Sequence, residues 1–224
     1  MPDAVNREAG SPVDGGGGAA LPWGPRCLGC GGAGQARLDL CDVCATRLPW
    51  AAPTARIAPP PGIDRVVAAF EYAPPLDRWL PRFKFHRDFA AGRLLAQLMR
   101  AACANAPRPD ALLPIPLHRA RLRQRGYDQG LELAKPLARG LALPLHCDLL
   151  RRVRATAPQS ELDAAARAGN LRGAFATTTR AGLPAHVALV DDVMTTGATL
   201  GAAAEALRHA GVARVDAWVC ARVR

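Results

Sequence analysis

The stretch from Val187 to Leu200 constrains the fold of this chain more than any other part of the sequence. It begins with the apolar residues 187–190, continues through Asp191 and Asp192 into a loop rich in Thr and Gly, and then enters a helical pattern. A strand, loop and helix in this order form the repeating unit of parallel α/β sheets. The stretch therefore predicts an α/β fold with a ligand at the carboxyl end of this strand.

The loop after the two carboxylates has the chemistry of a phosphate site. Free backbone N–H groups, the positive end of the helix dipole and threonine hydroxyls all suit a phosphate dianion. Gly197 would let the backbone approach the ligand closely, while Asp191 and Asp192 could hold the vicinal hydroxyls of a sugar or an associated cation. The alternative is an Asp at the strand end that caps the helix beside a Thr-rich turn.

Short apolar runs alternate with Ala- and Leu-rich helical stretches after Ile63. The strands are expected at residues 65–72, 111–116, 173–177, 187–190 and 213–220. The helices are expected at residues 88–104, 126–141 and 196–210. This alternation predicts a mostly parallel sheet that is covered by helices on both faces.

The chain before residue 63 divides into three parts by composition. Residues 1–22 are rich in Gly, Ala and Pro without a hydrophobic period, which predicts a disordered leader. Residues 23–48 contain four cysteines, and residues 49–62 are a proline-rich linker that suits neither a helix nor a central strand. Residues 63–224 would then form the α/β domain.

The cysteine-rich part contains two C-x-x-C pairs ten residues apart, Cys27 with Cys30 and Cys41 with Cys44. Two such pairs commonly build a tetrahedral zinc site, because each brings two thiolates to one side of a metal from a tight turn. A redox-active pair is one alternative, and disulfides, which a cytosolic location disfavours, are another. We expect a small structural zinc module. The single cysteines are expected to be buried core thiols: Cys103, Cys147 and Cys220.

The net charge is +10, but 27 of the 29 positive residues are arginine, so position matters more than the total. Residues 77–126 hold eleven basic residues against three acidic ones. This segment forms either solvated helix faces or a surface for the phosphates of a nucleotide or nucleic acid. No apolar run approaches the ~18 residues of a membrane helix, and the first twenty residues lack a signal-peptide pattern. We therefore expect a cytoplasmic protein without membrane insertion.

Residues 189–199 resemble the phosphoribosyl-pyrophosphate (PRPP) signature of type I phosphoribosyltransferases, and the whole chain is similar to the ComF family associated with bacterial competence. The similarity spans about residues 27–222 and includes segments 83–88, 114–119, 125–129, 156–159, 167–170 and 173–175. Asp128 departs from the family, which commonly has Asn there. The resemblance implies a type I phosphoribosyltransferase-like parallel sheet flanked by helices, with a small N-terminal zinc-ribbon module.

The same resemblance implies which residues would bind PRPP. Asp191 and Asp192 would bind the ribose hydroxyls, with Mg²⁺ as the accompanying cation. The 5-phosphate would lie in a cradle formed by Thr195, Thr196, Gly197, Ala198 and Thr199.

The resemblance also implies two segments that would contact pyrophosphate. The turn after the strand at 114–117 would be the pyrophosphate loop, with His118 and Arg119 nearby. Residues 151–159 look like a mobile flap that closes over the site. This flap would bring three side chains to the pyrophosphate, namely Arg151, Arg152 and Thr156, although solvation at the surface is the alternative for the arginines.

Two functions are consistent with these features. In the first, the chain is an enzyme or PRPP-binding protein linked to DNA uptake and natural competence, in which an unidentified acceptor displaces pyrophosphate from C1 of ribose. In the second, it is a non-catalytic factor that binds single-stranded DNA, works with competence-machinery proteins and retains the phosphate loop for regulation. An extended or turn-like segment would place the DNA-binding side chains on one side: Arg119, Arg121, Arg123 and Arg125.

Overall fold

A four-stranded parallel sheet forms the centre of the molecule. The computed structural model describes residues 24–52, 58–155, 171, 173–178 and 182–223. Within them the strand order is β1-β6-β5-β2, and each neighbouring pair is parallel. The strands are β1 (Arg65–Glu71), β2 (Ala111–Pro114), β5 (His186–Met194) and β6 (Arg214–Arg222). The expectation of a mostly parallel α/β sheet is confirmed.

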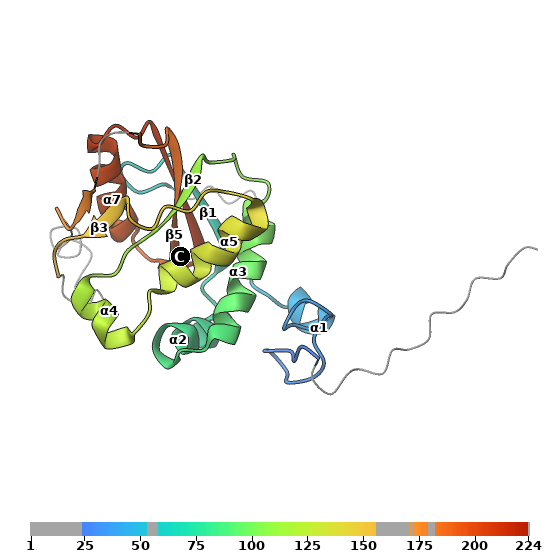
Figure 1. Cartoon of the computed structure of the whole chain (residues 1–224). Helices are drawn as coiled ribbons and strands as arrows, with labels where there is room; N and C mark the ends of the chain where they lie inside the picture. Colours follow the sequence, from blue (N-terminus) through green and yellow to red (C-terminus); the bar gives the residue numbers. More distant parts are fainter. Residues whose placement is uncertain (1–23, 53–57, 156–170, 172, 179–181, 224) are drawn as a thin grey trace, which may run out of the picture.

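Helices cover both faces of this sheet (Figure 1). The helices α3 (Phe89–Cys103) and α5 (Gln129–Leu141) lie on one face, and α7 (Ala198–His209) lies on the other. Because successive side chains of a strand point to opposite faces, Val190 joins the apolar cluster under α3 and α5, while Leu189 joins the cluster under α7. Burial on both faces explains why the start of β5 is a continuous apolar run.

A smaller sheet lies beside α7. It pairs β3 (Leu150–Arg152) with β4 (Phe175–Thr177) in an antiparallel manner. Residues 156–170, between these strands, lie outside the described part of the chain. The position of β4 agrees with the strand expected at 173–177.

The helix α2 (Leu76–His86) was not expected from the sequence, because Pro81 lies inside it. Its buried side chains recur on one side and pack toward α3: Leu76, Trp79, Leu80 and Phe83. A proline inside a helix removes one backbone hydrogen bond, and its ring clashes with the carbonyl four residues earlier. The burial of four large side chains offsets this loss here.

The expected extended segment at residues 119–125 is wrong, because these residues form the helix α4 (Arg119–Arg125). His118 caps the start of α4 by accepting a hydrogen bond from the Ala120 backbone N–H, and Gly126 ends it with a φ of 80°. Arg, Leu and Gln are good helix formers, so local propensity favours a helix between these caps. The structure describes every residue of α4, and none of them is buried.

The cysteine-rich module contains the short helix α1 (Asp42–Thr46) and packs against α3 (Figure 1). Leu40 and Leu48 are buried in the same apolar cluster as the α3 side chains. An ion pair joins Arg93 of α3 to Asp39 of the module. The module is therefore anchored to the α/β domain by both apolar and charged contacts.

The proline-rich segment also contacts the domain. Its start runs antiparallel to β1, since the Ala51 N–H donates to the Ala69 carbonyl at 3.0 Å and the Glu71 N–H donates to the Pro49 carbonyl at 2.9 Å. The proposed leader, residues 1–22, lies outside the described residues. Among the helices of the described ranges, none has the length and apolar character needed to span a membrane.

Two of the three single cysteines are buried as expected. Cys103 at the end of α3 and Cys220 in β6 are core residues. The same expectation is wrong for Cys147, which is exposed. Cys147 lies in the turn between Leu145 and β3, where the chain has left the sheet.

Candidate functional site

A cavity of about 670 Å³ opens beyond the carboxyl ends of β2 and β5. Open parallel sheets bind their ligands at this edge, and the volume lies in the ~300–1,000 Å³ range of small-molecule sites. Ile115 and Leu117, which follow β2, form one part of its lining. Asp191 and Asp192 of β5 form another, and Thr199 enters from the first turn of α7.

Five cationic side chains among the described residues line the same cavity: Lys84, Arg87, Arg121, Arg125 and Arg152. Burial and the nearby Arg121 charge lower the pKa of the Arg125 and Arg152 guanidinium groups. Arg125 and Arg152 are therefore partly desolvated and crowded by the charge of Arg121. A ligand with several negative charges would relieve that crowding.

Lys84 of α2 forms an ion pair with Asp192 of β5. Its Nζ lies 3.2 Å from Oδ1 and 2.8 Å from Oδ2, and the Asp192 side chain is only 3% exposed. The Val193 N–H also donates to Asp192 Oδ1 at 2.8 Å. The buried carboxylate is thus held by a cation from a helix more than a hundred residues away in sequence. No individual role was expected for Lys84 from the sequence, where it is one of the eleven basic residues of 77–126 and lies in segment 83–88 of the family resemblance.

Asp191 has a different environment from its neighbour. Its Oδ1 accepts a hydrogen bond from the Asp192 N–H at 2.9 Å. Burial and the charge of Asp192 raise the pKa of Asp191 to about 8. A carboxyl with this shift gains from a cation or from hydroxyl donors that stabilise its charged form.

Asp128 fixes the loop that follows β2. One of its oxygens accepts from the Leu131 N–H at the start of α5 at 3.1 Å, and the other accepts from the Leu117 N–H at 2.9 Å. Burial raises the pKa of Asp128. An asparagine has one side-chain oxygen and could not accept through both atoms. Asp128 therefore holds the cavity wall in place rather than forming a neutral contact to a ligand.

The helix α4 separates its four arginines into two pairs. Successive helical residues are rotated by ~100°, so Arg121 and Arg125 share one side and Arg119 and Arg123 share the other. Arg121 and Arg125 line the cavity, whereas Arg119 and Arg123 are exposed. His118 lines an adjoining hollow of about 170 Å³ together with Arg121.

The strand β3 separates its two arginines in the same way. Arg152 lines the cavity, and its guanidinium lies 5.4 Å from the centre of the Phe175 ring. Arg151, the preceding residue, is exposed, as the alternation of a strand requires. Thr156, the third residue expected to meet pyrophosphate, lies outside the described residues.

The Thr- and Gly-rich loop lies between two cavities. Thr199 lines the first, whereas Thr196, Gly197 and Ala198 line a second of about 680 Å³ beside Pro60. Thr195 is exposed. The five residues expected to cradle phosphate form the loop before α7 and its first two residues, and only the last of them lines the cavity with the acid pair.

Gly197 has a structural reason to be glycine. Its φ is 74°, and a Cβ atom there would lie 2.2 Å from Cγ of Pro60. Both the backbone conformation and the close approach of Pro60 require the absence of a side chain. The expected reason, close approach of a ligand, is not needed to explain this residue.

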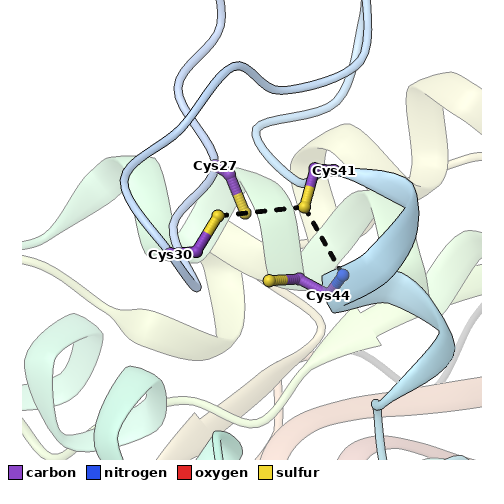
Figure 2. Close-up of side chains that lie close together, drawn as sticks. All are labelled: Cys27, Cys30, Cys41 and Cys44. Carbon is purple, nitrogen blue, oxygen red and sulfur yellow. Dashed lines mark hydrogen bonds between the residues drawn. The ribbon is translucent and has the colours of Figure 1, made fainter.

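The four cysteines of the two C-x-x-C pairs converge on one point (Figure 2). The sulfur atoms of Cys27, Cys30, Cys41 and Cys44 all lie within 4.8 Å of one another, and the Cys30 and Cys41 sulfurs are 3.9 Å apart. Zn–S bonds of ~2.3 Å place tetrahedral sulfurs about 3.8 Å apart. The donor set and its spacing therefore fit a closed tetrahedral metal site.

The thiols of this cluster ionise unequally. Burial disfavours the thiolate of Cys27, but N–H groups of Cys41, Cys30 and Gly29 outweigh it and lower the pKa of Cys27 to about 6. The Cys27 and Cys41 thiols raise the pKa of Cys44 to about 12. Four thiolates repel one another unless a cation lies among them, so a divalent metal would complete the site.

Comparison with known proteins identifies the family. A phosphoribosyl transferase domain family model matches residues 128–224. The chain is 35% identical over 207 residues to competence protein F of Haemophilus influenzae, covering 88% of this chain and 85% of that protein. It is 37% identical over 213 residues to DNA utilization protein YhgH of Salmonella typhi, covering 89% of this chain and 91% of that protein. The chain belongs to the ComF family.

The ComF resemblance expected from the sequence is thereby confirmed, together with the phosphoribosyltransferase-like fold and the N-terminal four-cysteine module. The matched domain contains the acid pair and the start of α7. Lys84, Arg121 and Arg125 lie before it in sequence, although they line the same cavity. The ComF-family chain thus completes the site with residues that precede the phosphoribosyl transferase match.

Proposed function

We propose that this ComF-family chain binds PRPP, or a related ribose 5-phosphate ligand, in the cavity at the end of β5. The observation that carries the proposal is one cavity that combines two carboxylates with five cations, next to the start of a helix. Carboxylates accept hydrogen bonds from ribose hydroxyls, and the cations suit the phosphates. The oxygen donors of Asp191 and Asp192 also fit Mg²⁺.

The same site supports transfer of the phosphoribosyl group. The bond between C1 and pyrophosphate breaks with its electron pair going to the phosphate oxygen. An acceptor lone pair forms the new bond to C1, and the acceptor loses a proton to solvent. Lys84, Arg121 and Arg152 stabilise the charge of the leaving pyrophosphate, and Mg²⁺, when bound, neutralises part of it.

Release of pyrophosphate from PRPP tests the transfer step. The assay contains Mg²⁺ and a panel of nucleobases and amines as acceptors. We expect release with at least one acceptor, and we expect Asp191→Asn to abolish it, because Mg²⁺ and the ribose hydroxyls lose the carboxyl whose charged form they would stabilise. Binding of PRPP without release for any acceptor would limit the function to ligand sensing.

We further propose that the outer side of α4 binds single-stranded DNA. Arg119 and Arg123 are exposed on that side, and the relatives are named for competence and for DNA utilization. Phosphate contacts release counterions, so the affinity falls with salt at a slope of about −0.7 per contact. Fluorescence anisotropy should show a slope lower by about 1.4 in Arg119→Ala/Arg123→Ala. An unchanged slope would remove DNA from this surface.

We infer that the four-cysteine cluster holds one structural zinc ion. All four donors are protein thiols, which leaves no open position for chemistry. The cytoplasmic location expected from the sequence stays a prediction.

A further inference from the structure

We propose that Phe85 and Arg125 form a stacking platform for a planar heteroaromatic ring, such as a nucleobase, at the rim of the cavity. The inference rests on the proposed function, because the platform would hold an acceptor ring beside the ribose. It assigns a ligand class to a part of the cavity that the PRPP contacts leave without a role.

Phe85 is exposed in an unusual place. Its side chain is 63% exposed, although it lines the same cavity as the acid pair. The buried side of α2 ends at Phe83, so Phe85 does not contribute to packing. Single exposed apolar residues are ordinary on a protein surface. Phe85 differs because the residue before it, Lys84, contacts Asp192.

Arg125 is held over the Phe85 ring. The carbon atom of its guanidinium lies 5.0 Å from the ring centre. Arg125 Nη1 also donates to Gln129 Oε1 at 2.9 Å, and Arg87 donates to the Arg125 carbonyl at 3.2 Å. These contacts fix a guanidinium and an aromatic ring in advance of ligand binding. Phe85 stays 63% exposed with Arg125 beside its ring, which leaves room for a second flat group to stack on it.

The charge of the cavity selects the kind of ring. A purely apolar occupant would desolvate the five cations and two carboxylates without giving them partners. A nucleobase can stack on Phe85 while the phosphates beside it meet the cations. Bases stack on aromatic side chains with little dependence on sequence, so the platform suits a heteroaromatic ring in general.

The test compares Phe85→Leu with Phe89→Leu. Phe89 is a matched control, because it is also an exposed phenylalanine, at 50%, and contacts Tyr127, but it does not line the cavity. The probes are free adenine, free uracil, a single-stranded oligothymidylate of fifteen nucleotides, and an abasic strand of the same length. Calorimetry measures the free bases, and anisotropy measures the strands. Thermal unfolding of each variant checks that the fold is retained.

We expect the wild type to bind at least one base-bearing probe, and Phe85→Leu to weaken that binding on the order of ten-fold. Phe85→Trp should retain it, Phe89→Leu should not change it, and no variant should alter binding of the abasic strand. If Phe85→Leu weakens binding of the free bases alone, a free acceptor is the source of the ring. If Phe85→Leu weakens binding of the oligothymidylate, DNA is the source.

Three results would overturn the platform: no base-bearing probe bound by the wild type, no loss in Phe85→Leu, or equal losses in Phe85→Leu and Phe89→Leu. Calorimetry with PRPP and Mg²⁺ on the same variants separates this inference from the proposed function. PRPP binding by the wild type together with any of these three results would reject the platform alone. Absence of PRPP binding with a selective loss in Phe85→Leu would reject the proposed function alone.

Discussion

A buried ion pair between Lys84 and Asp192 organises the centre of the site. The Asp192 side chain is 3% exposed, whereas the Lys84 side chain is 27% exposed. Removal of one partner of such a pair leaves an uncompensated charge in a region of low polarity. The pair therefore links α2 to β5 energetically as well as geometrically, and it keeps an ammonium group in the lining of the cavity that we propose for PRPP.

Lys84→Met should lower the free energy of unfolding by about 3 kcal/mol, because Asp192 loses its cation. Lys84→Met/Asp192→Asn should recover part of this loss, since the buried charge is then gone. Lys135→Met is the control, because Lys135 pairs with Glu132 on the surface and an exposed pair contributes below about 1 kcal/mol. Denaturant unfolding measures all three. Equal stability of Lys84→Met and the control would contradict the account of this pair.

At the scale of elements, α4 places one pair of arginines in the cavity wall and leaves the other pair exposed. Arg121 faces the cavity and Arg123 is exposed, although only one residue separates them. Arg121→Ala should weaken PRPP binding at least ten-fold, because a hydrogen bond to a charged group contributes about 1.5–3 kcal/mol. Arg123→Ala should leave PRPP binding unchanged. Calorimetry of both variants checks this, and similar losses in the two would mean that α4 does not face the ligand as described.

The sequence predicted the main strands and helices of the α/β domain from their hydrophobic patterns, but it missed the helices α2 and α4. The continuous apolar run before Asp191 identified β5, and the spacing of Leu94, Leu95, Leu98 and Met99 identified α3. The helix α4 has no buried residue and so no apolar period. The helix α2 contains Pro81, and a proline is unfavourable inside a helix.

Local motifs likewise identified part of the site. The acid pair was visible because its residues are adjacent in sequence. Lys84 was not assigned, because its contact with Asp192 depends on how α2 packs against the sheet, and no local pattern encodes that packing.

At the scale of the whole molecule, the four-cysteine module is joined to the α/β domain through α3. Leu40 and Leu48 of the module share one apolar cluster with α3, and Arg93 pairs with Asp39. Loss of the metal should therefore affect more than the module. The contacts with α3 depend on a module whose short chain has little core of its own.

Metal analysis should find one zinc ion per chain, and a chelator should lower the unfolding temperature of the α/β domain as well as release the metal. Cys41→Ser should have the same effect, because it removes one of four ligands. Cys147→Ser is the control, since Cys147 is exposed and lies outside the cluster. An unchanged zinc content in Cys41→Ser would rule out the four-cysteine site.

Calorimetric titration of PRPP with Mg²⁺ into the wild type and into Asp191→Asn/Asp192→Asn tests the central claim most directly. The wild type should bind one PRPP per chain. The double variant should lose at least ten-fold in affinity, because each charged hydrogen bond to a ribose hydroxyl contributes about 1.5–3 kcal/mol. Equal binding by the two proteins, or no binding by the wild type, would show that the cavity at the end of β5 is not a PRPP site.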